Sequence, residues 1–400
     1  GAAGLAAALA LARRGFGVTL LEAESRVGGR VRTAEVGGLS YDLGATWLHG
    51  RGAAHNPLWD FVDTAQQQVP APSSAATAPA GRPHVRWALA ETGEEVDGRA
   101  ARLCANAYEA ALEECQRLAA GLEVRGLPAG AAPGDVASAV AQLLDPGEGA
   151  LGPGAAPVAK AAAAAAAVDP QLAERAFDWR AQLECGISGC DEISELSLPA
   201  WGECVEMPGA VPMARRWPGG FGAVLQAAAA ALPEAVDVRL GRRVLRVDWG
   251  AAPRDGAEAP PCVRLLCRGP SGEDEEVEAG HAVVTASLGV LKEAVAGKGG
   301  PAFEPQLPAA KVSAIERLGF GTVDKVLLRY SEPWWEALWG RLHVLWAPAA
   351  AASPGWLRGV YSLSPAPHGL GLECWLAGRA AREMEAADEA EVAEALHALA

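Results

Sequence analysis

The opening residues of the chain place two glycines and a later acidic residue where a dinucleotide site needs them. Gly1 and Gly4, in Gly1-Ala2-Ala3-Gly4, fit the last two glycines of the GxGxxG pattern and open an alanine-rich segment. In that pattern the second glycine lets the backbone approach a pyrophosphate, and the third lets a helix pack closely on a strand. Glu22 ends the next apolar run, near the roughly 20-residue distance at which an acid binds a ribose hydroxyl pair. These residues predict dinucleotide binding; a chance GxxG and a solvated Glu22 are the alternatives.

A second glycine pair follows in Gly28-Gly29-Arg30. Two adjacent glycines allow a backbone to pass close to a ligand, and an arginine beside them can form a bidentate contact with a phosphate. For this short motif alone, a flexible loop with a surface arginine is the alternative.

One lysine lies within an otherwise largely apolar predicted strand. Lys325 stands in the segment 323–328, beside valines and leucines. Desolvation there would lower the pKa of the ammonium and let the side chain accept and return protons. The alternative is a surface lysine whose stem lies on the apolar face while its charge reaches water.

The elements that must position these residues alternate between helices and strands, which predicts an α/β fold of mixed α+β character. We expect a helix over 1–14, a buried strand over 18–21 and a hairpin turning at Gly37-Gly38. Further helices are expected over 104–120, 136–144, 161–176 (interrupted near Pro170), 221–232 and 307–318. Further strands are expected over 236–240 and 244–249, joined by a turn at Gly241, and then over 281–285, 323–330, 341–347, 356–362 and 372–377.

Composition narrows the class of protein further. The 400 residues are half hydrophobic and carry a net charge of −15. So acidic a chain is ill suited to gripping nucleic-acid phosphates, whereas a negative field concentrates a cationic small substrate. The eight cysteines form no CxxC, so we expect reduced thiols and no metal centre. No apolar run predicts a membrane span.

The longer motifs resemble the flavin-containing amine oxidase family, and most closely its polyamine oxidases of the spermine oxidase and N1-acetylpolyamine oxidase type. The resembling stretches are Leu21-Glu22-Ala23, Arg26-Val27-Gly28-Gly29-Arg30, Asp42-Leu43-Gly44-Ala45-Thr46-Trp47-Leu48-His49-Gly50 with Asn56-Pro57, 183–189 (LECGISG), 284–292 (VTASLGVLK) and 318–326 (LGFGTVDKV). The resemblance covers the chain except the loops near 70–100 and 145–170. The order of these motifs is specific, although no single stretch would be.

The resemblance implies an FAD flavoprotein that oxidises an amine. The flavin of this family takes a hydride from the carbon next to an amine nitrogen, water hydrolyses the imine, and O2 is reduced to H2O2. The expected substrate is a polyamine: spermine, spermidine or an acetylated form. The fold it implies is a Rossmann-like FAD-binding domain, at 1–58 and 206–296, interleaved with a substrate-binding domain of mixed sheet and helices, at 59–205 and 297–400.

Residue by residue, the resemblance also implies site roles. The cofactor contacts it implies are Gly1, Gly4, Glu22, Gly29, Arg30, Thr46, Trp47 and Val244. Two catalytic candidates follow: Lys325 matches a lysine that reaches flavin N5 through a water, and His49 matches a histidine near the amine. For His49 a simple loop hydrogen bond is the alternative.

Substrate contacts are implied at three further positions. Glu184 and Ser188 match positions that bind the polyamine chain, where a carboxylate would pair with a distal ammonium. Tyr361, with Trp334 and Trp335, is expected to wall the cleft through cation–π contacts. A surface position for Glu184 and a place in the core for the aromatic residues are the alternatives.

The chain departs from the family pattern in two respects. Glu24 stands where relatives usually carry arginine, which puts one phosphate-side or adenine-side contact in doubt. The C-terminal flavin segment of the family would lie beyond Ala400, and Gly1 lies inside a motif, so we expect a chain truncated at both ends that binds FAD poorly. A truncated, non-catalytic fragment is therefore an alternative to an active enzyme.

Related classes of flavoprotein share parts of the same pattern. Phytoene desaturases and protoporphyrinogen oxidases have the dinucleotide fingerprint, but His49 and Lys325 argue against them. A histone lysine demethylase would be expected to carry a long coiled-coil insertion, and no sustained heptad pattern is present. We expect a cytoplasmic protein, with a peroxisomal one as the alternative because a targeting tripeptide would lie in the absent tail.

Overall fold

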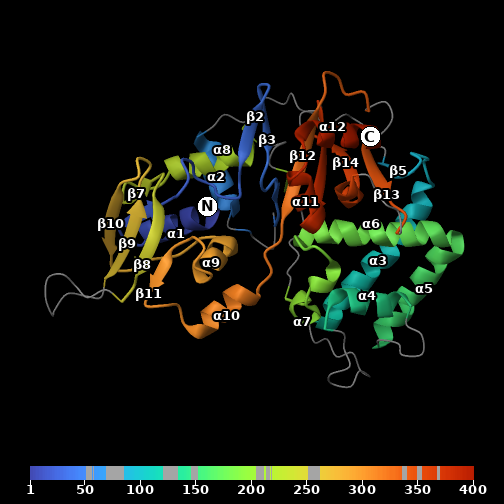
Figure 1. Ribbon diagram of the computed structural model, residues 1–400, viewed down its shortest axis with the longest axis horizontal. Coiled ribbons are helices and arrows are strands. Elements are labelled where there is room, and N and C mark those ends of the chain that lie inside the picture. Colours follow the sequence, from blue (N-terminus) through green and yellow to red (C-terminus); the bar gives the residue numbers. More distant parts are fainter. Residues whose placement is uncertain are drawn as a thin grey trace. The chain divides into compact units, whose positions relative to one another are not determined.

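The computed structural model describes residues 1–50, 56, 58–68, 85–119, 134–145, 152–203, 211–212, 217, 219–250, 262–335, 340–348, 354–366 and 370–400. The chain divides into two compact units. Unit 1 comprises Gly1–Ala76 and Met207–Leu318, and unit 2 comprises Thr77–Glu206 and Gly319–Ala400. Each unit therefore combines separate segments of the chain, and most of their helices and strands are labelled in Figure 1.

In unit 1, a helix and a short parallel sheet carry the opening motif. Helix α1 (Ala2–Ala12) forms from alanine and leucine and ends before Gly15, which has φ of 85°. Strand β1 (Val18–Leu21) pairs in parallel with β7 (Val236–Arg239). The core between these elements contains Leu5, Trp59, Phe221 and Leu225, from α1, α2 (Leu58–Gln68) and α8 (Gly220–Ala230).

Unit 1 also contains a four-stranded sheet. Its order is β10-β9-β8-β11, with β8 at Arg243–Asp248, β9 at Val263–Arg268, β10 at Asp274–Ala279 and β11 at Ala302–Glu304. Strand β11 runs parallel to β8. Helix α10 (Ala309–Arg317) packs against α9 (Leu288–Val295), where Lys292 Nζ donates to the Glu316 carbonyl at 2.8 Å.

Two boundaries between the units differ from the predicted domain boundaries. The segment 297–318 belongs to unit 1, because β11 pairs with β8 and α10 packs on α9. Helix α2 also belongs to unit 1, because Trp59, Phe61 and Val62 are buried in the same core as α8. The predicted bounds at 58 and 296 thus differ from the observed division after 76 and 318.

Unit 1 also contains the two-stranded ribbons β2-β3 and β4-β6. Strands β2 (Thr33–Val36) and β3 (Leu39–Asp42) form the predicted hairpin, and both of its turn glycines, Gly37 and Gly38, have positive φ. Strand β4 (Trp47–Leu48) pairs with β6 (Val211–Pro212).

Three predicted strand features are wrong. Residues 356–362 do not form one strand, because Gly355–Gly359 is a 3-10 helix that buries Trp356 and Leu357, and the next strand begins only at Ser362. The strands near 236–240 and 244–249 form, but they belong to different sheets, because Gly241 N and Arg242 N donate to the carbonyls of Glu24 and Glu22 and turn the chain away from β7. The segment 281–285 is not a strand: Val283 and Val284 are exposed and, among the described residues, the segment joins no ladder. A strand needs a partner for its backbone groups, and apolar β-branched residues alone do not supply one.

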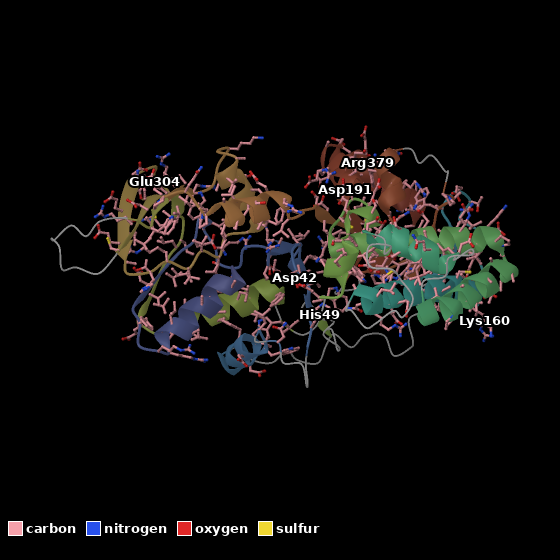
Figure 2. All side chains as sticks on the ribbon, turned by 90° about the horizontal axis from the view of Figure 1, so that it is seen from below. Asp42, His49, Lys160, Asp191, Glu304 and Arg379 are labelled. Atoms are coloured by element: carbon pink, nitrogen blue, oxygen red, sulfur yellow. The ribbon has the colours of Figure 1, made fainter. Side chains whose placement is uncertain are left out.

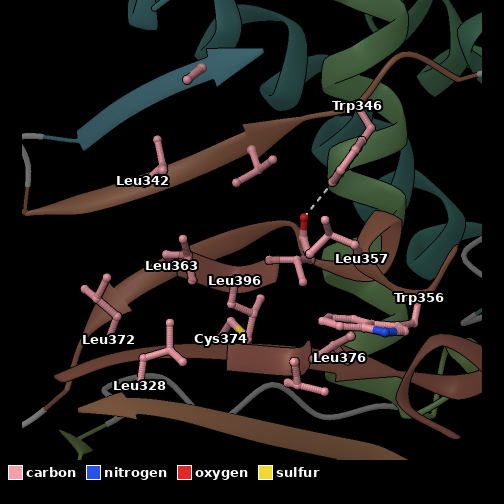
Figure 3. Close-up of a cluster of buried hydrophobic side chains, with 14 of the residues drawn as sticks. Leu328, Leu342, Trp346, Trp356, Leu357, Leu363, Leu372, Cys374, Leu376 and Leu396 are labelled. Carbon is pink, nitrogen blue, oxygen red and sulfur yellow. Dashed lines mark hydrogen bonds between the residues drawn. The ribbon is translucent and has the colours of Figure 1, made fainter. Parts of the chain in front are cut away.

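Unit 2 contains a five-stranded sheet of order β12-β15-β14-β13-β5. The strands are β5 (Val85–Leu89), β12 (Val323–Arg329), β13 (Arg341–Leu345), β14 (Ser362–Pro365) and β15 (Gly371–Ala377). Strand β5 pairs with β13 in parallel, and the other pairs are antiparallel. Helices α11 (Gly378–Glu385) and α12 (Glu389–Leu399) contribute Ala381 and Leu396 to the core of Figure 3, where Trp346 Nε1 donates to the Val360 carbonyl at 2.9 Å.

Helices build the other part of unit 2. Helix α3 (Gly98–Ala119) packs against α4 (Val136–Leu144), α5 (Gly152–Val168), α6 (Pro170–Ser188) and α7 (Leu198–Trp201). The break between α5 and α6 follows from Asp169, whose carboxylate accepts from Gln171 N and Leu172 N, and from Pro170 at the first helical turn. The predicted interruption near Pro170 is confirmed. None of the helices within the described ranges combines the length and apolar character needed to cross a bilayer.

Candidate functional site

The N-terminus of α1 and the glycine loop at 28–30 meet at close range in unit 1. A β-carbon added at Gly29 would lie 3.3 Å from Gly1 Cα, and one added at Gly4 would lie 3.1 Å from Thr285 Oγ1. Both Gly28 and Gly29 also have positive φ. No side chain caps α1, so its first backbone N–H groups remain directed at whatever lies before the helix. The glycines therefore form a narrow backbone cradle with the positive end of a helix dipole beside it.

Glu22 lies at this cradle, as the sequence predicted. Its Oε2 is 3.2 Å from the Gly1 nitrogen, and its Oε1 accepts from Glu24 N at 3.1 Å. The Glu22 backbone is bound on both sides, because Glu22 N donates to the Arg239 carbonyl and the Glu22 carbonyl accepts from Arg242 N. The end of β1 thus holds a mostly buried carboxylate at the start of α1.

The loop after Gly29 is held by an arginine whose role the sequence did not indicate. Arg26 donates to the carbonyls of Val27, Gly29 and Val31, which fixes the turn that presents Arg30. The Arg30 side chain is exposed, and its carbonyl accepts from Ala45 N at 3.1 Å. The signal for Arg26 was its place just before the glycine pair, since a guanidinium can satisfy several carbonyls of a turn that lacks regular structure.

The segment that contains Thr46, Trp47 and His49 follows directly from this loop. Thr46 is buried, with its hydroxyl donating to the Gly44 carbonyl at 3.4 Å, whereas Trp47 is 43% exposed. His49 is also exposed, and its carbonyl accepts from Trp59 Nε1 at 3.2 Å (Figure 2). The exposed Trp47 and His49 side chains are thus available to a ligand of unit 1.

A second group without a predicted role caps helix α8. Asp42 Oδ1 accepts from Phe221 N at 2.9 Å, and Thr33 Oγ1 accepts from Gly222 N at the same distance. Gly220 has φ of 67°, and a β-carbon there would collide with the Asp42 carboxylate. Asp42 and Thr33 therefore join the β2–β3 hairpin to α8 and position the loop that follows Asp42.

Val244 lies in β8, opposite Cys267 of β9, and a register shift separates it from Arg246. Near it, Arg239 and Arg242 both form ion pairs with Glu275 of β10. Since Arg242 N also binds the Glu22 carbonyl, the segment that carries Val244 starts from the same backbone junction as Glu22.

Lys325 belongs to unit 2. It lies in the middle of β12, opposite Trp375 of β15, and its Nζ is 4.4 Å from the centre of the Trp375 ring. The indole face stabilises the ammonium by a cation–π contact, while the Trp375 Nε1 donates to Glu373 Oε1 at 2.7 Å. Lys325 is half-buried, so the side chain is neither freely solvated nor fully enclosed.

Glu184 is not a surface residue, contrary to the alternative that the sequence left open. It is 4% exposed, and its carboxylate accepts from Arg180 Nη1 at 3.1 Å and from Ser188 Oγ at 2.8 Å. Arg180 also pairs with Glu109 of α3. Within unit 2 the charge of Glu184 is thus already matched, so its predicted contact with a substrate ammonium would have to compete with Arg180.

Tyr361 and Trp335 both lie in the core of unit 2. Tyr361 is 8% exposed, and a β-carbon added at Gly186 would lie 2.9 Å from its hydroxyl. Burial raises the pKa of the Tyr361 hydroxyl to about 12. Trp335 is fully buried, and Trp334 packs edge-on against it. The packing of Tyr361 and Trp335 follows the core alternative; their predicted role as cleft walls has no exposed surface to support it in unit 2.

The comparison with protein families places the chain among known enzymes. The family described as flavin containing amine oxidoreductase matches residues 2–398. The chain belongs to this family. Membership confirms the predicted resemblance and the predicted cofactor, FAD, and it makes the protein a flavin-containing amine oxidoreductase. Among the described residues, no group of three or more His, Cys, Asp or Glu side chains is arranged to hold a metal ion.

Several curated relatives are polyamine oxidases. The chain is 30% identical to Polyamine oxidase 1 of Oryza sativa subsp. japonica, over 100% of this chain and 76% of the relative. It is 29% identical to the human Peroxisomal N(1)-acetyl-spermine/spermidine oxidase, over 52% of this chain and 41% of the relative. It is also 29% identical to a rice Lysine-specific histone demethylase 1 homolog 3, over 84% of this chain and 34% of the relative.

Solved structures of amine oxidases share the fold. Cyclohexylamine Oxidase from Brevibacterium oxydans IH-35A matches with a TM-score of 0.63 and 18% identity, over 99% of this chain and 77% of that one. Wild-type Putrescine Oxidase bound to putrescine matches with a TM-score of 0.62 and 15% identity, over 98% and 77%. The predicted fold class is confirmed.

The residues of unit 1 fit a flavin dinucleotide. A β-carbon at Gly29 would crowd Gly1 Cα, and Gly29 has positive φ, so this part of the cradle favours glycine and suits a pyrophosphate in close contact with the backbone. The amide groups at the uncapped start of α1 suit its negative charge, and the Glu22 carboxylate suits a ribose hydroxyl pair. Each predicted cofactor residue from Gly1 to Trp47 lies in unit 1, as does Val244.

Proposed function

We propose that this family member oxidises a polyamine, with O2 as the second substrate and H2O2 as a product. The flavin supplies the chemistry by accepting a hydride from the carbon next to an amine nitrogen, and water then hydrolyses the imine. The substrate class rests on the similarity to the polyamine oxidases together with the net charge of −15, which favours a polycationic substrate. Spermine, spermidine and their acetylated forms are the candidates.

The observation that carries the cofactor half of this proposal is the Glu22 carboxylate at the N-terminus of α1. Glu22 would bind the ribose hydroxyls, the α1 amide groups would bind the pyrophosphate, and Arg30 would neutralise phosphate charge. Thr46 and Trp47 would flank the flavin side of the site, and Val244 would meet the adenine through its backbone.

In the same proposal, Lys325 holds a water by its ammonium and moves a proton through it during amine oxidation. His49 would orient the amine through its exposed imidazole. Glu184 and Ser188 would bind the far end of the polyamine only if Arg180 releases part of the carboxylate, because Arg180 and Ser188 now occupy both of its oxygens.

The test is a substrate panel under anaerobic conditions. The purified chain, saturated with FAD, should show flavin absorbance that bleaches on addition of spermine, spermidine or N1-acetylspermine. Admission of O2 should restore the colour and release H2O2. Cyclohexylamine and a methylated histone-tail peptide serve as comparison substrates.

The outcomes separate the competing functions. Bleaching by the histone peptide alone would favour a demethylase, the second candidate suggested by the demethylase relatives. Flavin that binds but never bleaches with any polyamine would refute the substrate assignment, and failure to retain FAD would favour the non-catalytic alternative.

A further inference from the structure

The C-terminus of α6 carries a pair of cysteines at the two positions that its terminal turn brings together. Gly189 ends the helix in the left-handed region, with φ of 69°. The Cys185 carbonyl accepts from Gly189 N at 2.8 Å and from Cys190 N at 3.2 Å. The bond from Cys190 N is the six-residue closure found in the Schellman motif, where the side chains of the first and last residues commonly touch. In this helix those two side chains are thiols.

The two side chains shift each other's acidity in opposite directions. The neighbouring Cys190 side chain raises the pKa of Cys185, and burial raises it further. The neighbouring Cys185 side chain lowers the pKa of Cys190, although burial opposes that shift. Cys190 is 6% exposed and Cys185 is half-buried, so the pair lies just beneath the surface of unit 2.

The backbone around the pair is fixed by packing. A β-carbon at Gly321 would collide with the Gly189 carbonyl, and one at Gly378 would lie 2.5 Å from Asp191 Cα. Asp191 also pairs with Arg382 of α11, in a second attachment of the same segment (Figure 2 labels Asp191). The backbone on both sides of Cys190 is therefore fixed by packing.

We propose that Cys185 and Cys190 are an oxidisable dithiol that hydrogen peroxide converts into a reversible disulfide across the C-terminus of α6. The turn holds the two residues close together, because Cys190 N donates to the Cys185 carbonyl. A disulfide requires such proximity, since the two Cα atoms of a disulfide lie about 4.4–6.8 Å apart. Of the other described cysteines, Cys104, Cys115, Cys267 and Cys374 are buried singly in the core clusters or strands, and Cys262 is half-buried just before β9.

The reaction balances in two steps. The Cys190 thiolate attacks one peroxide oxygen, the O–O bond breaks, and the departing hydroxide takes a proton to become water, which leaves a sulfenic acid. The Cys185 sulfur then attacks the Cys190 sulfur and expels the hydroxyl group, which leaves as a second water with the Cys185 proton. Two thiols are oxidised to one disulfide, and one peroxide is reduced to two waters.

Oxidation of the pair depends on the geometry of the turn and is independent of amine turnover. Hydrogen peroxide would be a product of the proposed oxidase reaction, but the test supplies it from outside. A chain that turns over no polyamine can therefore still confirm the dithiol, and a chain that oxidises polyamines can still refute it.

The test follows both thiols in one peptide. The full chain is treated with hydrogen peroxide, quenched with catalase, denatured in N-ethylmaleimide and digested after glutamate, which releases residues 185–192 between Glu184 and Glu192. We expect this peptide to resist alkylation, to be lighter than the reduced peptide by two hydrogen atoms, and to recover both thiols after dithiothreitol. Its oxidation should be on the order of tenfold faster than that of Cys262, because a stabilised thiolate reacts faster with peroxide.

Variants separate a disulfide from unrelated oxidation. In Cys185→Ser, the Cys190 thiol should stop at a sulfenic acid that dimedone labels, and Cys262→Ser should leave the behaviour of the pair unchanged. The proposal is overturned if peptide 185–192 from the wild-type chain carries two alkylated thiols after peroxide treatment, or sulfinic acid without a disulfide.

Discussion

Glu22 is the single side chain on which nucleotide binding depends most. Its carboxylate already lies where the first turn of α1 and the end of β1 meet, so replacing it with an amide removes charge without removing volume. We predict that Glu22→Gln weakens FAD binding by about 1–3 kcal/mol, through the loss of charge-assisted hydrogen bonds.

The measurement is FAD affinity by fluorescence titration of the apoprotein. Glu234→Gln is the matched control, because Glu234 is exposed in unit 1 just before β7 and should leave the affinity unchanged. Equal affinities for Glu22→Gln and the wild-type chain would contradict the ribose contact.

Substitution of Lys325 tests proton transfer during amine oxidation rather than FAD binding. Lys325 belongs to unit 2 and the residues proposed to bind FAD belong to unit 1, so we expect Lys325→Met to leave FAD bound. We predict that the variant reduces the flavin about 100-fold more slowly with a polyamine, since a positioned proton carrier contributes on this scale.

Anaerobic stopped-flow spectroscopy measures that rate directly. Lys311→Met, on the exposed side of α10, is the matched control and should reduce at the wild-type rate. A Lys325→Met chain that reduces as fast as the control would remove the proposed role.

At the scale of elements, α6, β5 and β13 meet around a half-buried histidine. His343 lies 4.5 Å from the ring of Trp87 and 4.7 Å from that of Trp179, and its buried Nδ1 has no hydrogen-bond partner among the described residues. Burial, with nearby Arg341 and Arg102, lowers the pKa of His343 to about 3. The aromatic junction therefore holds a neutral imidazole.

This junction should make the protein sensitive to acid. The unfolded chain binds a proton at His343 below a pH of about 6.5, whereas the folded chain does not until the pH approaches 3. The free energy of unfolding therefore contains the full contribution of neutral His343 above a pH of about 6.5. Between that pH and about 3, it falls by about 1.4 kcal/mol for each unit by which the pH is lowered.

We predict that lowering the pH from 6 to 4 reduces the free energy of unfolding of His343→Phe by about 2 kcal/mol less than that of the wild-type chain. The phenylalanine keeps a ring between the two tryptophans but binds no proton. Urea unfolding at both pH values measures the difference, and unfolding above pH 7 supplies the control, since the imidazole is neutral there in both states. Parallel pH profiles of the two proteins would contradict the prediction.

At the scale of the whole molecule, the net charge of −15 should attract polyamines from solution. We predict that kcat/KM for spermine falls several-fold as ionic strength rises from about 0.02 M to about 0.2 M, because salt screens long-range attraction. Cyclohexylamine, with a single charge, provides the comparison and should show a weaker dependence. An equal salt dependence for both amines would show that the overall charge does not steer the substrate.

Spacing along the chain was enough to predict that Gly1, Gly29 and Glu22 lie together in unit 1. Their proposed contacts with FAD use backbone approach and a strand end, and such features depend on neighbours within about one helix and one strand. The same local logic predicted the β2–β3 hairpin and the break at Pro170.

Long-range packing determined the rest. The pairing of Glu184 with Arg180, the burial of Tyr361 against Gly186 and the junction of His343 with two tryptophans each depend on which faces of α6 and the unit 2 sheet meet. The segment 281–285 has the composition of a strand but no ladder among the described residues of unit 1, because a strand exists only with a partner. Residue types therefore specified the chemistry available to this protein, whereas contacts between distant segments determined which of those side chains are exposed, paired or buried.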